Sequence, residues 1–393
     1  MRQEDGVSLI ELLVSMTLML TVTAAVFSLM NPTQGAFMVE PEVADMQQRM
    51  RVASDTLYHD LLMAGGGSYM GASKGSLNYF FAPVMPFRQG LSNDDPPGTF
   101  RTDAITLLYV PSTSSQTSIS QEMPARSAHL KVNADPGCPK NDQLCGFAKG
   151  MSVLIYDDTG SYDVFTVSSV QESALHLQHN LNDLSKSYGA GAKIVQVVSH
   201  TYYLKNDDAT KTYQLMHYDG GSSNDVPVVD HVVGLTFDYF GDPQPPLMRR
   251  PVSDPTGPWT TYGPKPPAAG VQTTAWPAGE NCVFTSDPSP TPAPRLAVLG
   301  AGGTTTALVK LTEAELRDGP WCPDVTSPNR FDADLLRIRK IGVTLRVESA
   351  VAALRGPLGA LFTHGGTSQS GNRFAPDQEV RFQVSPRNLN LGR

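Results

Sequence analysis

The chain begins with a long apolar run. Between Val7 and Met30 every residue is apolar or a small hydroxyl residue except Glu11, and the run contains neither glycine nor proline. About 20 apolar residues in a helix cross the hydrocarbon core of a bilayer, so residues 7–30 are predicted to span a membrane. A carboxylate at membrane depth costs roughly 2.5–3.5 kcal/mol, so Glu11 is expected to have a partner there.

A second helical pattern follows the apolar run. Prolines and a glycine within residues 32–41 predict a kink or a pause where the helix leaves the membrane. An amphipathic continuation of the helix is then expected over residues 31–67, ending at the three glycines of residues 65–67. Asp60 belongs to the polar positions that are expected to lie mostly off the apolar stripe. The stripe itself recurs at steps of three or four: Val43, Met46, Met50, Ala53, Leu57, Leu61 and Ala64.

Beyond residue 67 the pattern is that of β-strands. A hairpin is expected with its turn near residues 206–208, and closely spaced strands around residues 145–200 predict a small β-barrel or curled sheet inserted in the head. The fold class is therefore α+β, a long N-terminal helix packed on a β-rich head over residues 68–393. The strands expected with most regular alternation are Thr102–Val110, Met151–His179 (several strands), Lys193–Tyr203, Val228–Phe240, Leu335–Glu348 and Val380–Val384.

Composition narrows this picture. Hydrophobic residues make up 40% of the 393 and charged residues 17%, which is typical of a folded chain, and the net charge of -8 argues against bulk attraction to nucleic acid. Residues 242–294 hold 14 of the 31 prolines, so a Pro-rich surface insertion is expected around residues 241–295. This insertion is either an irregular segment that lies on the protein surface or a partner-binding loop. In the second case its contact residues would be Trp259, Tyr262 and Trp276.

Three interpretations of the N-terminus compete. A cleaved secretory signal has a basic start and a short apolar core, whereas this chain starts MRQEDG and its apolar run continues beyond the small residues 23–25. A plain signal anchor fits the length of the run but leaves Glu11 unexplained. The third interpretation is a processing and assembly signal that uses the glutamate.

The stretch Gly6-Val7-Ser8-Leu9-Ile10-Glu11-Leu12 resembles the prepilin processing motif of type IV pilins and type II secretion pseudopilins. The resemblance implies that residues 1–6 are a leader peptide, that a prepilin peptidase cuts between Gly6 and Val7, and that the new amine of Val7 is N-methylated. Glu11 would then be the fifth mature residue, paired with the N-terminal amine of a neighbouring subunit. Val7 departs from the more usual phenylalanine, and the acidic leader departs from the usual basic one.

The segment RVASDTLYHDLLMAGG looks like the one after the helical spine in PilW-type minor pilins and in the J-type minor pseudopilin. This resemblance implies a non-enzymatic minor pilin that helps to initiate or cap a type IV pilus. Its implied partners are other minor pilins, the major pilin, the prepilin peptidase and the inner-membrane assembly platform. It would be a bacterial inner-membrane protein with a periplasmic head, moving later to the pilus tip. Alternatives are a type II secretion pseudopilin and a membrane-anchored binding module or adhesin.

The chain has four cysteines, Cys138, Cys145, Cys282 and Cys322. Four cysteines allow three pairings, and nearest pairing gives Cys138–Cys145 and Cys282–Cys322. Disulfides persist in exported heads, and the second bridge would hold the end of the Pro-rich insertion. A zinc site is the alternative, but the sequence has no CxxC and no close Cys/His cluster.

Signals for catalysis or ligand binding are weak. The sequence has no GxSxG, HExxH or P-loop motif. His176 and His179 are expected on a strand surface. The aspartates at 157, 158 and 163 suggest calcium less than they suggest a hairpin turn, because their spacing misses the EF-hand pattern. No cofactor and no metal are therefore expected.

Overall fold

A computed structural model of the chain describes residues 8–66, 82–88, 99–111, 115–134, 138, 142–144, 146–157, 162–180, 184–207, 211–219, 225–246, 283–285, 293–299, 307–322, 330–369 and 373–390. The chain divides into two compact units. The N-terminal unit combines Met1–Arg51 with Arg346–Glu379, and the head unit combines Val52–Leu345 with Val380–Arg393.

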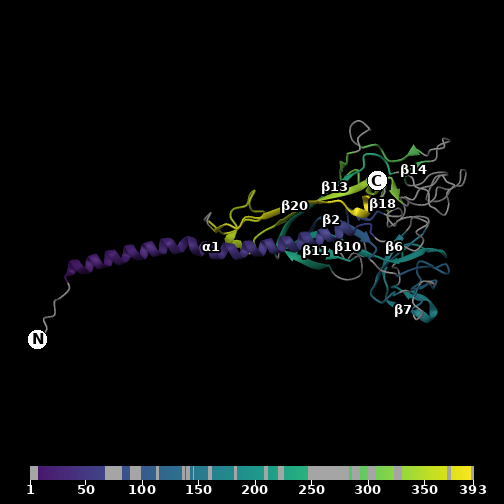
Figure 1. Cartoon of the computed structure of the whole chain (residues 1–393), viewed down its shortest axis with the longest axis horizontal. Coiled ribbons are helices and arrows are strands. Elements are labelled where there is room, and N and C mark those ends of the chain that lie inside the picture. The colour runs from purple at the N-terminus through teal and green to yellow at the C-terminus, as the bar shows by residue number, and fades with distance from the viewer. Residues whose placement is uncertain are drawn as a thin grey trace. The chain divides into compact units, whose positions relative to one another are not determined.

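The N-terminal element is one α-helix, α1 (Leu9–Met63), drawn without a break in Figure 1. The expected pause at the prolines is wrong, because helical structure continues through Pro32, Gly35 and Pro41. A proline removes one N–H donor from the helical ladder, while the bonds of the flanking turns remain, so a long helix can continue past it. The predicted membrane half and the amphipathic half therefore belong to a single helix.

The apolar stripe in the second half of α1 is confirmed. Its members at 46, 53, 57, 61 and 64 are completely buried. The helix ends where the glycines predicted, because Gly65 takes a φ of 70°, a left-handed conformation that closes helices. A Cβ at this position would also lie 3.0 Å from Leu389 Cδ2, so glycine suits both the backbone and the packing.

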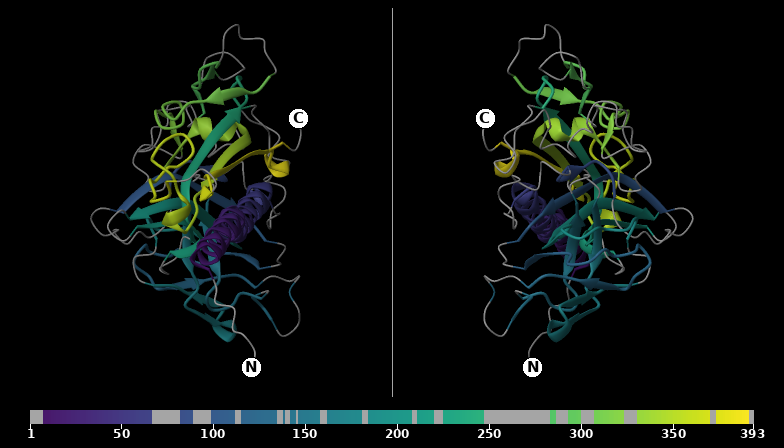
Figure 2. Two further views of the ribbon diagram at one scale, coloured as in Figure 1. Left: turned by 90° about the vertical axis from the view of Figure 1, so that its left-hand side faces the viewer. Right: turned by 90° about the vertical axis from the view of Figure 1, so that its right-hand side faces the viewer.

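The head unit contains a five-stranded antiparallel sheet in the order β1-β2-β10-β11-β12. The expected hairpin is confirmed, with β10 and β11 paired from Thr201↔Tyr218 to Asp207↔Thr212. The blue and teal strands of this sheet can be followed in the two views of Figure 2. Its strands are β1 (Val84–Met85), β2 (Thr99–Tyr109), β10 (Val198–Asp207), β11 (Thr212–Tyr218) and β12 (Val226–Asp230).

A four-stranded sheet has the order β16-β13-β19-β20, with β16 (Val309–Leu311), β13 (Val232–Gly241), β19 (Ile338–Val347) and β20 (Gln378–Val384). The single strand expected over residues 228–240 is wrong. His231, with a φ of 58°, breaks it into β12 and β13, which belong to different sheets. The strand expected from residue 335 begins only at Ile338, after the 3₁₀ turn η4 (Ala333–Arg337).

Two small sheets lie between β2 and β10 in sequence. One has the order β3-β9-β5-β6, with β3 (Gln116–Ser118), β9 (Lys193–Gln196), β5 (Ser152–Tyr156) and β6 (Tyr162–Thr166). The other has the order β4-β8-β7, with β4 (His129–Lys131), β8 (His176–Gln178) and β7 (Ser169–Gln171), followed by the 3₁₀ turn η3 (Glu172–Ala174). One hydrophobic cluster, which includes Ile155, Leu177 and Ile194, joins them. The strands expected around residues 145–200 therefore pair with β3 and β4, which the sequence analysis did not identify.

Short elements complete the described chain. They are β14 (Phe284–Thr285) paired with β15 (Ala293–Pro294), β17 (Trp321–Cys322) paired with β18 (Phe331–Asp332), and the 3₁₀ turns η5 (Ala352–Leu354) and η7 (Arg387–Asn390). Most of the Pro-rich insertion lies outside the described residues, its three aromatic side chains included. A long N-terminal apolar helix followed by a β-rich head confirms the α+β class.

Candidate functional site

The first turn of α1 is closed by a capping box. Ser8 precedes the helix, and its Oγ accepts a hydrogen bond from Ile10 N at 3.2 Å. Glu11 Oε2 accepts the reciprocal bond from Ser8 N at 3.0 Å. The sequence Ser-x-x-Glu satisfies two backbone donors that a helix start leaves without partners. Glu11 thus has a role within its own helix, which the sequence analysis overlooked although the motif was readable.

The half of α1 after this box is apolar and uncovered. Leu9–Ser28 is long and apolar enough to cross a membrane, with a mean hydropathy of 2.1 and none of it buried in the chain. Its hydroxyl groups donate to backbone carbonyls of the preceding turn, for example Ser15 Oγ to Leu12 O and Thr17 Oγ1 to Val14 O, both at 2.9 Å. Polar atoms satisfied in this way are compatible with a lipid or helix-bundle environment.

Gly6 and Val7, the predicted cleavage and methylation positions, lie outside the described residues. Processing after Gly6 and methylation of Val7 therefore remain predictions. Glu11 is placed in the first turn of the apolar helix, one turn from the predicted new N-terminus. Glu11 Oε2 accepts the capping hydrogen bond, so the other carboxylate oxygen, Oε1, can accept a hydrogen bond from an amine of another chain.

A second polar constellation lies inside the head unit, under the amphipathic half of α1. Asp60 is only 5% exposed, and its Oδ2 accepts a hydrogen bond from Tyr202 OH at 2.5 Å. His200 Nδ1 lies 3.1 Å from the same oxygen and 2.6 Å from His217 Nε2. Tyr109 OH donates to Asp60 Oδ1 at 3.4 Å. The carboxylate of Asp60 thus contacts side chains from β2 and β10. The sequence analysis did not predict these contacts.

A signal for this residue existed. Asp60 follows Leu57 by three positions and precedes Ala64 by four, so helical spacing places it on the apolar stripe rather than off it. A buried carboxylate on an apolar face requires hydrogen-bond donors, and the tyrosines of the sheet supply them. We refer to Asp60, Tyr109, His200, Tyr202 and His217 as the Asp60 network.

Burial sets the protonation of this network. Burial lowers the pKa of His200 to about 4, against a smaller opposing effect of Asp60. Burial also lowers the pKa of His217 and raises the pKa of Tyr109 to about 12, with Asp60 adding to the latter shift. The imidazoles of His200 and His217 and the phenols of Tyr109 and Tyr202 are therefore neutral at neutral pH beside the carboxylate of Asp60.

The network predicts an acid-sensitive head. In the unfolded chain a histidine binds a proton near pH 6.5, whereas folded His200 does so only near pH 4. The free energy of unfolding should therefore be highest above about pH 6.5 and fall by roughly 2–3 kcal/mol as the pH drops to about 4. Urea denaturation of the detergent-solubilised full chain at a series of pH values measures this slope. His200→Gln should reduce this slope, with His217 supplying the remainder, and the control His176→Gln should leave it unchanged; equal slopes in all three proteins would contradict the assignment.

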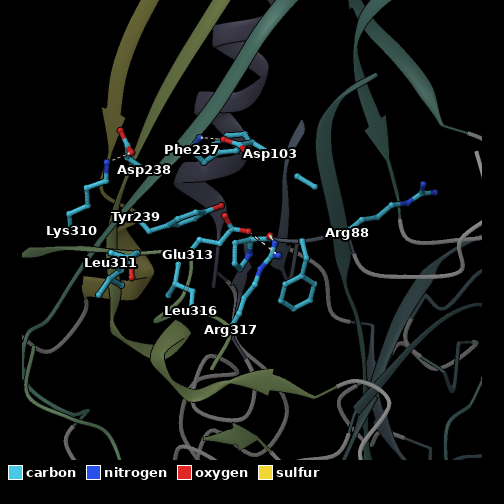
Figure 3. A pocket seen from close by; sticks show the side chains of 14 residues that line it. Arg88, Asp103, Phe237, Asp238, Tyr239, Lys310, Leu311, Glu313, Leu316 and Arg317 are labelled. Carbon is cyan, nitrogen blue, oxygen red and sulfur yellow. Dashed lines mark hydrogen bonds and ion pairs between the residues drawn. The ribbon is translucent and has the colours of Figure 1, made fainter. Parts of the chain in front are cut away.

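The head unit also has an open cavity of about 790 Å³ between residues of β13, β16 and the segment after β1 (Figure 3). Its charged groups are largely paired with one another. Lys310 Nζ lies 2.7 Å from Asp238, and Arg317 lies 2.9 Å from Glu313. The phenol of Tyr239 points among them, and burial raises its pKa. Since the charges are compensated, the cavity has no strong preference for an anion or a cation.

Two of the remaining sequence candidates, His179 and Asp163, have structural roles, and Asp158 lies outside the described residues. His179 is 3% exposed, so its expected place on a strand surface is wrong; its ring packs 5.0 Å from that of Phe165 and adds to the small-sheet core. Asp163 is buried and accepts hydrogen bonds from Ser185 and from Tyr188 OH at 2.8 Å. Its carboxylate is thus used by the chain itself.

An acidic cluster of Asp318, Asp332 and Asp334 is likewise satisfied. Arg337 donates to Asp334, and backbone N–H groups of Gly319 and Asp334 donate to Asp332. These contacts supply hydrogen-bond donors to the two buried carboxylates, Asp332 and Asp334.

The structure describes two of the four cysteines, Cys138 and Cys322. Neither Cys138 nor Cys322 is a free thiol. Cys145 and Cys282 lie outside the described residues, so the predicted pairing stays a prediction.

Comparison with known families gives one match, and it falls on the first candidate site. Residues 1–27 match the family described as the prokaryotic N-terminal methylation motif. A search of curated proteins finds no match. The matched segment contains the predicted cleavage position, the capping box and most of the apolar span. The match supports a type IV pilin- or pseudopilin-like protein, and the apolar helix behind the motif is long and apolar enough to anchor such a protein in a membrane.

Proposed function

We propose that the protein is a minor pilin, most similar to the PilW type, that helps to initiate or cap a type IV pilus. The observation that carries the proposal is Glu11 in the first turn of an uncovered apolar helix, within a segment that matches the N-terminal methylation motif. The prepilin is anchored in the inner membrane with its head in the periplasm. Cleavage after Gly6 exposes the amine of Val7, and Glu11 then pairs with the amine of a neighbouring subunit.

The physics of the apolar helix supports assembly over simple anchoring. An isolated carboxylate in a membrane or a helix bundle is costly, while one beside a cation is much less so. A neighbour's N-terminal amine is such a cation, and pairing sets the axial register of two helices. The head supports a terminal position: it has several sheets and a long Pro-rich insertion, which fit a fibre tip better than a repeating shaft.

The proposal includes no catalytic role. The Asp60 network is enclosed under a helix, and the charges of the cavity are paired among themselves. A type II secretion pseudopilus uses the same N-terminal chemistry and is separated from a pilus by the phenotype of a deletion: loss of secretion in one case, loss of pili in the other. A membrane-anchored adhesin that never joins a filament would leave both intact.

The decisive test is the intact mass and N-terminal sequence of the membrane-extracted protein, with and without the prepilin peptidase. A mature chain that starts at methylated Val7, seen only with the peptidase, is the expected result. A chain that keeps Met1, or one cut near Ala25, would exclude the processing step and leave an ordinary anchor or signal peptide.

A further inference from the structure

The N-terminal unit contains an exposed apolar loop. It lies between β19 and β20, and its exposed residues are apolar: Leu358 is 74% exposed, Leu361 59% and Val351 39%. Residues 352, 353, 357, 359 and 360 between them are also exposed, and all are alanine, proline or glycine. We call residues 351–361 the apolar loop. Isolated exposed leucines are ordinary on protein surfaces, but a run of this kind indicates a contact site.

Contacts on the buried side of the loop support its conformation. Phe362 and Phe374 pack edge to face with their ring centroids 5.5 Å apart. Ala375 N donates to Leu354 O at 2.9 Å, and Arg346 Nη2 donates to Ala360 O at 2.9 Å. A contact surface that is ordered before binding loses little conformational entropy when it binds.

The charges of this segment lie behind the loop and not on its exposed side. Glu348, whose side chain is 1% exposed, forms an ion pair of 2.8 Å with Arg355, and His364 Nδ1 lies within hydrogen-bond distance of the same carboxylate oxygen, at 2.8 Å. Asp377, whose side chain is completely buried, pairs with Arg346 at 3.0 Å. The only charged residue between 351 and 361 is therefore committed to a buried partner, and the exposed side matches an apolar surface.

The loop is fastened to α1 within the same unit. Ala350 N, directly before the loop, donates to Glu42 Oε1 at 2.6 Å. Met38 lies one helical turn before Glu42 on the same face and is 53% exposed, and the adjacent Phe37 is 73% exposed. The side chains of Phe37 and Met38 thus add exposed apolar surface to α1 close to Glu42, the residue that anchors the loop.

We propose that the apolar loop, together with Met38, docks the apolar N-terminal helix of another pilin-type subunit, an inference that rests on the proposed function. Lipid is a poorer occupant, because Glu42 lies 14 residues beyond Ser28. At 1.5 Å per residue the loop is anchored about 21 Å past the span, whereas the headgroup layer adds only about 5–8 Å to each side of the hydrocarbon core. A neighbouring helix in a bundle runs alongside α1 over this distance.

Site-specific photo-crosslinking in the full chain tests the proposal. A benzophenone amino acid is placed at Leu358, and at the exposed polar Thr367 of the same segment as the control. Irradiation is carried out in cells that contain the pilus machinery. The expected product joins position 358 to a peptide from the apolar N-terminal helix of a pilin-type subunit, with no such product from position 367.

A second readout uses charge. The double variant Leu358→Asp, Leu361→Asp should reduce co-purification of pilin-type subunits by about tenfold or more. Burial of the two leucine side chains on docking contributes at least about 1.4 kcal/mol to binding, which corresponds to this factor. The matched control, Thr367→Asp with Gln369→Asp, should have no effect, and both proteins should melt like the unsubstituted chain.

The outcomes separate the inference from the proposed function. If pilin-type subunits co-purify with the unsubstituted chain but position 358 crosslinks only to lipid or to nothing, the docking surface is overturned and the pilin role stands. If no pilin-type subunit co-purifies with the unsubstituted chain, the proposed function fails and the docking surface with it.

Discussion

Replacing Glu11 by valine is expected to stop incorporation of the protein into filaments while leaving cleavage after Gly6 nearly intact. The peptidase acts on the leader side of the motif, whereas Glu11 is needed when the mature amine of a neighbour enters the helix bundle. Leaving that amine buried without its carboxylate costs about 3 kcal/mol or more, which corresponds to a loss of about 100-fold in assembly. Co-purification with other pilin-type subunits, and the mass of the mature chain, measure the two effects separately.

Glu11→Gln is the informative control, because the structure gives Glu11 two roles. Glutamine also serves at the third position of a capping box, so this variant keeps the bond to Ser8 N but loses the charge. If charge pairing is the basis of assembly, both variants fail alike. If Glu11→Gln assembles normally and only Glu11→Val fails, then helix capping and not the neighbour's amine explains the need for Glu11.

Asp60→Ala is expected to lower the free energy of unfolding of the head by about 3 kcal/mol. The change leaves Tyr202 OH without its 2.5 Å acceptor, and it removes the carboxylate beside Tyr109 and His200. Each buried donor that loses its acceptor costs about 1–3 kcal/mol. Urea denaturation of the detergent-solubilised chain at pH 7.5 gives the value.

Asp55→Ala is the matched control, since Asp55 lies on the same helix but is exposed. Its effect should stay within about 0.5 kcal/mol. Asp60→Asn should fall between the two, because an amide oxygen can still accept from Tyr202. Equal effects of the alanine substitutions at 55 and 60 would mean that the Asp60 network adds nothing to the packing of the stripe.

The two predictions concern opposite halves of one helix. The half before Ser28 has its apolar surface uncovered, and its carboxylate lies in the first turn. The half after Val52 buries its stripe and its carboxylate inside its own head unit. The difference explains why Glu11 is expected to affect assembly and Asp60 stability.

Local patterns in the sequence determined most of the architecture. The length of the apolar run, the spacing of the stripe up to Ala64 and the glycines after it predicted α1 and its end, because helix period and chain termination are local properties. The β10–β11 hairpin and the last strand followed from alternation and turn residues in the same way. The processing motif was likewise readable in seven consecutive residues, and the family match falls on it.

Tertiary structure alone decided features that depend on distant partners. The break at His231 separates two strands that join different sheets, and β3 and β4 exist as strands because β9 and β8 pair with them. Asp60 is buried because tyrosines more than 40 positions away supply donors, and the exposed side of the apolar loop carries no charge because Arg355 pairs with the buried Glu348. Sequence spacing fixes which residues share a face, but only the assembled fold decides what that face meets.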